Sequence, residues 1–65
     1  MITVNGKSLD VCAGITLQEL LDAQGYRLDV IAVEYNGRIT PKDAYADTVL
    51  QEGDKLEVVS FVGGG

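Results

Sequence analysis

The sequence contains no histidine and only one cysteine, Cys12. Without histidine, the chain lacks the commonest general base and the commonest zinc ligand of proteins. A single cysteine cannot form an internal disulfide, which is typical of a protein kept in the reducing cytoplasm. We expect Cys12 to end a strand as a small apolar side chain with no chemical role.

Targeting segments and long apolar runs are also missing. The chain starts Met1-Ile2-Thr3-Val4, without a positively charged leader. No apolar stretch approaches the roughly 18 residues that a membrane-spanning helix requires. We therefore expect neither a secretion signal nor a membrane anchor.

The length and the charge restrict the function further. The 65 residues suffice for one small domain, with little room for a deep cleft that holds its own catalytic groups. We therefore do not expect an enzyme. Apolar residues make up 46% of the chain, which predicts a folded core. The net charge of −5 disfavours nucleic acids and anionic membranes as partners and favours a basic protein surface.

Two Asn-Gly pairs, Asn5-Gly6 and Asn36-Gly37, stand between segments of alternating apolar and polar residues. Asn-Gly readily adopts the two positive φ angles of a tight hairpin turn. The sequence therefore predicts one hairpin over about residues 1–12 and a second over about residues 30–40.

A helix is expected over residues 17–24, between the two hairpins. Thr16 and Glu19 have the spacing of a capping box, and Gly25 has the position of a left-handed helix end. An apolar stripe with helical spacing consists of Leu17, Leu20 and Leu21.

After Pro41 we expect a short helical turn in which Tyr45 closes one end of the core, then a last strand from Lys55 to Val62. The intervening loops are acidic, and we interpret their carboxylates as a solvated surface without metal-loop spacing. These residues are Asp43, Asp47, Glu52 and Asp54.

The resulting element order, two strands, one helix, two strands and a final strand, predicts an α+β fold of the β-grasp, ubiquitin-like type. We expect a mixed sheet of about five strands with one main helix packed on one face. The last strand would lie centrally and parallel to the first, because the helical crossover permits a parallel neighbour. Residues 1–62 would form the domain, and residues 63–65 a flexible C-terminal tail.

The glycines at positions 63–65 follow the last strand directly. They are interpreted either as a disordered terminus without a role or as a flexible segment that carries a reactive α-carboxylate at Gly65. Ordering such a segment in a partner costs about 1–2 kcal/mol per residue in backbone entropy. Contacts elsewhere on the domain would have to offset that cost.

Alternation along the last strand predicts where those contacts lie. Leu56 and Val58 would face the helix, while the intervening side chains face away from it, on the uncovered side of the sheet. Exposed apolar patches of this kind often mark interfaces, although loops can cover them and single exposed apolar residues are ordinary. The predicted partner interface comprises Glu34, Glu57, Val59, Phe61 and Val62.

Taken together, these segments resemble the ThiS family, the sulfur carrier proteins of thiamin biosynthesis. The resemblance covers the whole length, and Tyr45 departs from it by replacing a tryptophan common in the family. Its pieces are Val4-Asn5-Gly6, Thr16-Leu17, Leu20-Leu21, Ala32-Val33, Asn36-Gly37, Pro41-Lys42, Glu52-Gly53-Asp54 and Val62-Gly63-Gly64-Gly65.

The resemblance implies a reusable protein cosubstrate that supplies no catalytic group, binds no cofactor or metal, and is a monomer when alone. An E1-like, ThiF-like enzyme would use ATP to adenylate the Gly65 carboxylate. Sulfur from a persulfide donor would then convert it to a thiocarboxylate for a ThiG-like thiazole synthase. Gly63 and Gly64, which lack Cβ atoms, would thread through the narrow active sites of these partners.

Three other functions share some of these features. The small subunit of molybdopterin synthase has the same fold and activation chemistry, but the triple glycine after Val62 and the short length favour the thiamin carrier. A ubiquitin-like tag would join Gly65 to a lysine amine. A plain interaction module would leave the tail inert, so substitution of Gly65 distinguishes it from the other classes.

Overall fold

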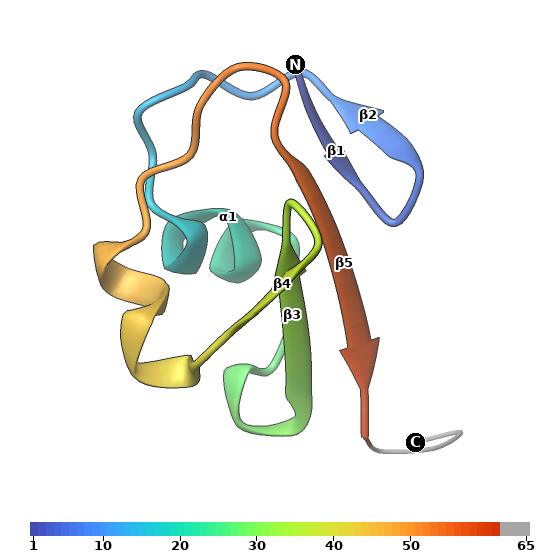
Figure 1. The fold of residues 1–65 in the computed structure, drawn as a ribbon, viewed down its shortest axis with the longest axis vertical. Coiled ribbons are helices and arrows are strands. Elements are labelled where there is room, and N and C mark those ends of the chain that lie inside the picture. The colour runs from blue at the N-terminus through green and yellow to red at the C-terminus, as the bar shows by residue number, and fades with distance from the viewer. Residues whose placement is uncertain (62–65) are drawn as a thin grey trace.

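The computed structural model describes residues 1–61, which contain a five-stranded mixed sheet in the order β2-β1-β5-β3-β4 (Figure 1). Helix α1 packs on one face of this sheet, and β5 is its central strand, so the predicted β-grasp architecture is confirmed. The elements are β1 (Ile2–Val4), β2 (Lys7–Leu9), α1 (Leu17–Ala23), η1 (Leu28–Val30), β3 (Ile31–Tyr35), β4 (Arg38–Thr40), η2 (Lys42–Asp47) and β5 (Lys55–Ser60).

Both Asn-Gly pairs form the predicted hairpin turns. Asn5 and Asn36 each have φ of 51°, and the glycines that follow them are also left-handed. The first hairpin is shorter than predicted, because β2 ends at Leu9. Cys12 therefore lies beyond the strand and is exposed, so the expectation that it ends a strand as an apolar filler is wrong.

Helix α1 begins and ends as its sequence indicates, within one residue. The Glu19 amide donates to Thr16 Oγ1 at 3.1 Å, and the Thr16 amide donates to Glu19 Oε1 at 2.8 Å, which completes the capping box. At the other end, the Tyr26 amide donates to the Leu21 carbonyl at 3.0 Å, with Gly25 at φ +84°. This is a Schellman ending, and it turns the chain back toward the sheet.

The core lies between α1 and the sheet, and η2 closes one end of it. Tyr45 is only 2% exposed, so its predicted role as the aromatic side chain that closes the core is confirmed. Leucines of α1 pack with apolar side chains of the sheet, and this burial is the main source of stability for so small a domain. The buried apolar residues are Ile2, Val4, Leu17, Leu20, Leu21, Ile31, Val33, Tyr45, Leu50, Leu56 and Val58.

Strand β5 pairs in parallel with β1 and antiparallel with β3, as predicted for a central last strand. It ends at Ser60, which is opposite Ile31, rather than at Val62. Residues 28–30, which precede β3, form η1, so β3 offers β5 no pairing partner beyond Ile31. The Phe61 amide makes one further bond, to the Val30 carbonyl at 2.7 Å. The predicted boundary between a domain of residues 1–62 and a tail of residues 63–65 lies outside the described residues and stays a prediction.

Candidate functional site

Strand β5 has one buried face and one exposed face. Leu56 is 0% and Val58 8% exposed on the side of α1, whereas Val59 is 60% exposed and Glu57 is also exposed on the other side. This alternation is the one that the sequence predicts. It leaves the face of the sheet opposite α1 uncovered by any helix of residues 1–61.

Cross-strand register gathers the exposed residues of three strands on that face. Val59 of β5 lies opposite Ala32 of β3, and Glu57 lies opposite Glu34. Glu34 in turn lies opposite Ile39 of β4, which is 68% exposed. Ile39 was missed from the sequence, although the two-residue turn at Asn36-Gly37 already implies that positions 34 and 39 face each other.

Phe61 is 68% exposed and follows the last residue of β5, so it lies next to this face rather than within the strand. The bond from its amide to the Val30 carbonyl fixes the backbone at that point. We use the name open-face patch for Ala32, Glu34, Ile39, Glu57, Val59 and Phe61.

Two carboxylates lie side by side within the open-face patch. Glu34 and Glu57 are directly opposite each other and both are exposed. Within residues 1–61 neither side chain has a hydrogen bond or an ion pair. They line a shallow depression of about 430 Å³ at the β3–β5 junction. Its other lining residues are Asn36, Gly37 and Lys55.

The asparagines of both hairpin turns hold β5 in place with their side chains. Asn5 Oδ1 accepts from the Val58 amide at 2.7 Å, and Asn5 Nδ2 donates to the Val58 carbonyl at 3.2 Å. Asn36 Oδ1 accepts from the Lys55 amide at 2.8 Å. Each asparagine therefore supplies both a left-handed turn residue and a polar partner for the central strand. The sequence signals the first role but not the second.

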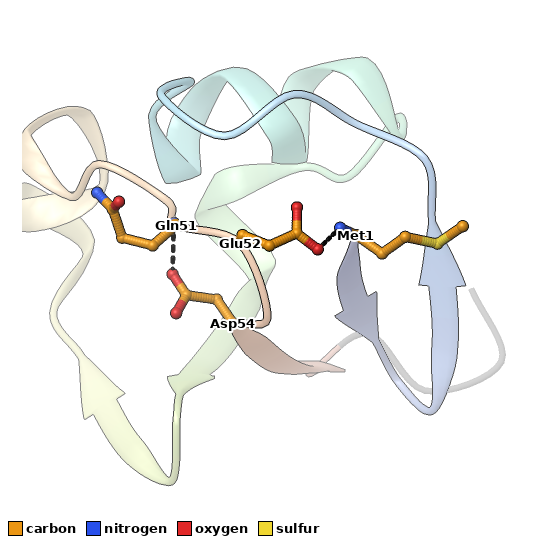
Figure 2. Close-up of polar contacts among 4 residues, drawn as sticks. All are labelled: Met1, Gln51, Glu52 and Asp54. Carbon is orange, nitrogen blue, oxygen red and sulfur yellow. Dashed lines mark hydrogen bonds and ion pairs between the residues drawn. The ribbon is translucent and has the colours of Figure 1, made fainter.

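Asp54 anchors the start of β5. It is 8% exposed, so the interpretation of this residue as part of a solvated acidic surface is wrong. Its carboxylate accepts from the Tyr35 hydroxyl at 2.5 Å and from Asn36 Nδ2 at 3.0 Å. It also accepts from the Gln51 amide at 2.7 Å (Figure 2). The neighbouring Glu52 pairs with the amino group of Met1, and both of these residues are exposed (Figure 2).

These bonds determine the ionisation of the network. Burial by itself would raise the pKa of the Asp54 carboxyl, but the hydrogen bonds from Tyr35, Gln51 and Asn36 stabilise the carboxylate and lower the pKa below its ordinary value. The pKa of the Tyr35 phenol is raised. The largest cause is its hydrogen bond to Asp54, and burial and the negative charge of Asp54 add to it. Asp54 is therefore ionised at neutral pH and serves as a structural anchor of the strand.

Residues 1–61 contain no group of acidic, cysteine or histidine side chains that could hold a metal ion. No helix in that part of the chain is long and apolar enough to cross a membrane. The remaining predicted site residues, Val62, Gly63, Gly64 and Gly65, lie outside the described residues, so their roles stay predictions.

Comparison with known proteins shows matches along nearly the whole chain. The model of the ThiS family matches residues 2–65. The chain is 35% identical to the sulfur carrier protein ThiS of Bacillus subtilis, over 100% of both chains, and 30% identical to that of Escherichia coli, over 98% of this chain and 97% of the relative. It is also 41% identical to a thiazole synthase of Paramagnetospirillum magneticum, over 98% of this chain but only 20% of that protein.

Among solved structures, the fold is similar to the crystal structure of the thiamine biosynthesis protein ThiS from Geobacter metallireducens. The TM-score is 0.79 at 34% sequence identity, and the match covers 98% of this chain and 97% of the other. The family match over residues 2–65 assigns the chain to a family, and the sheet with its central β5 and open face agrees with that assignment. The chain belongs to the ThiS family.

Proposed function

We propose that this chain is a sulfur carrier protein of thiamin biosynthesis in which the Gly65 carboxylate carries the sulfur. The observation that supports this most directly is the family match over residues 2–65, together with full-length similarity to two sulfur carrier proteins. The chain itself contributes a carboxylate and a docking surface, and its partners contribute the catalysis.

The proposed chemistry begins with a carboxylate, which is a poor electrophile. A partner enzyme of the E1-like, ThiF-like class would bind ATP, and the Gly65 carboxylate would attack its α-phosphorus and release pyrophosphate. A persulfide on a donor protein would then attack the acyl carbon and displace AMP. A second thiol would break the resulting S–S bond, so that a thiocarboxylate remains on Gly65 and a disulfide forms. ATP is thus used by the partner, and the carrier binds no cofactor of its own.

Gly63 and Gly64 would lie in the active sites of the partners during these steps. Without Cβ atoms they leave room for a narrow channel and for a nucleophile that approaches the Gly65 carbonyl. The open-face patch, with Val62 beside it, would supply the binding energy that offsets the entropy lost when the glycines become ordered.

Thiazole synthase is the proposed acceptor of the sulfur. Two thiazole synthases, from Paramagnetospirillum magneticum and Magnetococcus marinus, match this chain over 20% of their length at 41% and 42% identity. A carrier-like region within a synthase keeps the two activities together, which supports a direct encounter between them. The proposal places the monomeric carrier in the cytoplasm, where ATP and thiols are both available.

The proposal is tested by mass spectrometry of the chain after incubation with ATP, the adenylating enzyme and a persulfide source. Replacement of one oxygen by sulfur at Gly65 is the expected result. Oxidation of Met1 or Cys12 adds nearly the same mass, so fragmentation must localise the change to the C-terminal peptide. An unmodified Gly65, with enzyme that is active on another carrier, would overturn the proposal.

A further inference from the structure

The pair formed by Glu34 and Glu57 opposes the stability of the fold. Directly opposed side chains on neighbouring strands have Cβ atoms about 5 Å apart, and like charges in that position are destabilising. Register places Glu34 opposite Glu57, and no cation within residues 1–61 pairs with either carboxylate. Lys55 lines the same depression, but it forms no ion pair with them.

The surroundings of the pair limit what it can bind. Ile39 flanks Glu34 on β4, and the Ala32–Val59 pair occupies the next exposed position toward the end of β5. Apolar surface thus adjoins the two carboxylates, which share a depression of about 430 Å³. An occupant that complements this surface carries positive charge at its tip and an apolar stem beside it.

We propose that the partner protein which docks on the open-face patch inserts an arginine between Glu34 and Glu57. A guanidinium has five donors in a planar fork, so it can donate to two carboxylates at once, whereas an ammonium is a compact point charge. Its aliphatic stem would cover Ile39 and Val59. This inference rests on the proposed function, because it identifies the E1-like adenylating enzyme as the partner.

The test compares three variants of the full chain with matched changes in charge. Glu34→Gln and Glu57→Gln each remove one carboxylate of the pair. Asp47→Asn removes one negative charge from η2, which packs beside α1 rather than on the open face. Asp47 is exposed, and its carboxylate, like those of the two glutamates, has no hydrogen bond or ion pair within residues 1–61.

Affinity for the adenylating enzyme is measured by calorimetric titration, and thermal stability is measured on the free variants. We expect Glu34→Gln and Glu57→Gln each to weaken binding on the order of tenfold, because the guanidinium loses one of its two acceptors. Their melting temperatures stay equal to that of the wild type or rise, since the repulsion is relieved. Asp47→Asn changes affinity by less than about twofold, as expected of a remote, screened charge.

Equal losses of affinity in all three variants would indicate net charge alone and would overturn the arginine contact. Unchanged affinity in both glutamine variants would also overturn it.

A second experiment treats the enzyme with phenylglyoxal, which modifies arginine, and maps the modified peptides. We expect one arginine to be protected from modification when the carrier is bound and to be modified when it is absent. Absence of such an arginine contradicts the proposal. A carrier that binds but gains no sulfur at Gly65 overturns the proposed function instead, while the affinities still decide the contact.

Discussion

Asn5 and Val58, which are 53 positions apart in sequence, exchange two hydrogen bonds. The Val58 amide donates to Asn5 Oδ1 at 2.7 Å, and Asn5 Nδ2 donates to the Val58 carbonyl at 3.2 Å. The parallel ladder between β1 and β5 is short, with Thr3 opposite Lys55 and Val4 opposite Leu56. The Asn5 side chain thus extends the pairing of β5 beyond the end of β1, on the part of the strand that carries the open-face patch.

Replacement of Asn5 separates its two roles. Asn5→Gly keeps the left-handed backbone at φ 51° but removes the two side-chain bonds to Val58 and the longer one, 3.5 Å, from Asn5 Nδ2 to the Tyr26 hydroxyl. We expect it to lower the free energy of unfolding by about 1–3 kcal/mol. Asn5→Ala loses the same bonds and adds the cost of a left-handed alanine, about 1 kcal/mol more. Urea denaturation measures both effects. Equal stability of Asn5→Gly and the wild type would show that the bonds to Val58 contribute nothing.

The Asp54 network predicts a second stability effect. Asp54→Asn keeps the size of the side chain, but its amide offers one oxygen where the carboxylate accepts three bonds. We expect a loss of about 2 kcal/mol at neutral pH, because a partly buried donor is left without an acceptor. Glu52→Gln is the matched control: Glu52 is exposed, so the loss of its ion pair with Met1 costs little. Similar losses in the two variants would contradict an anchoring role for Asp54.

The same network predicts how stability depends on pH. The pKa of Asp54 is lower in the folded chain than its ordinary value, so the unfolded chain binds the proton more tightly. The stabilisation is present above the unfolded pKa of about 4 and is lost as the pH falls through the folded pKa. We therefore expect the difference in stability between wild type and Asp54→Asn to shrink as the pH falls through the acid range below the unfolded pKa. Parallel stability curves over that range would rule out this linkage.

The sequence predicts the elements that are specified by local signals. The Asn-Gly turns, the Thr16–Glu19 capping box and the ending at Gly25 each depend on a few adjacent residues, and the structure confirms them. The central place of β5 follows from connectivity, because the helical crossover lets a late strand pair in parallel with the first.

Features that depend on tertiary contacts were not found from the sequence. Asp54 is in an acidic loop, and its burial depends on donors from β3 and its turn, Tyr35 and Asn36, that lie 18 or more positions away. The end of β5 at Ser60 depends on where its partner β3 begins, at Ile31, directly after η1. The alternation of apolar and polar residues alone predicts that β5 continues to Val62, because this pattern does not show where the pairing partner, β3, begins.

The open-face patch predicts a loss of binding that is separate from any loss of folding. Val59→Asp places a charge on a side chain that is 60% exposed, so we expect the free energy of unfolding to change by less than about 1 kcal/mol. Affinity for the adenylating enzyme is expected to fall about tenfold or more, because the charge would be buried against an apolar contact. Phe61→Asp is expected to behave in the same way.

Ala46→Asp is the control for this loss of binding, because Ala46 is exposed in η2 and the substitution adds the same charge next to α1. Calorimetric titration gives the affinities, and thermal unfolding verifies the fold of each variant. Unchanged affinity of both open-face variants would exclude this face of the sheet as the docking surface.

The proposed chemistry at Gly65 requires that its carboxylate reach the α-phosphate of ATP in the partner. Addition of one alanine after Gly65 converts that carboxylate to an amide and moves the new carboxylate about 3.5 Å farther along the chain. We expect adenylation to be abolished, with ATP–pyrophosphate exchange at background, while affinity through the open-face patch falls much less. The control variant Gln24→Ala changes an exposed residue far from position 65 in sequence and keeps Gly65 as the last residue, so it should leave exchange unchanged. Normal exchange by the extended chain would show that the partner does not select the Gly65 carboxylate, and the proposed site of sulfur attachment would then be wrong.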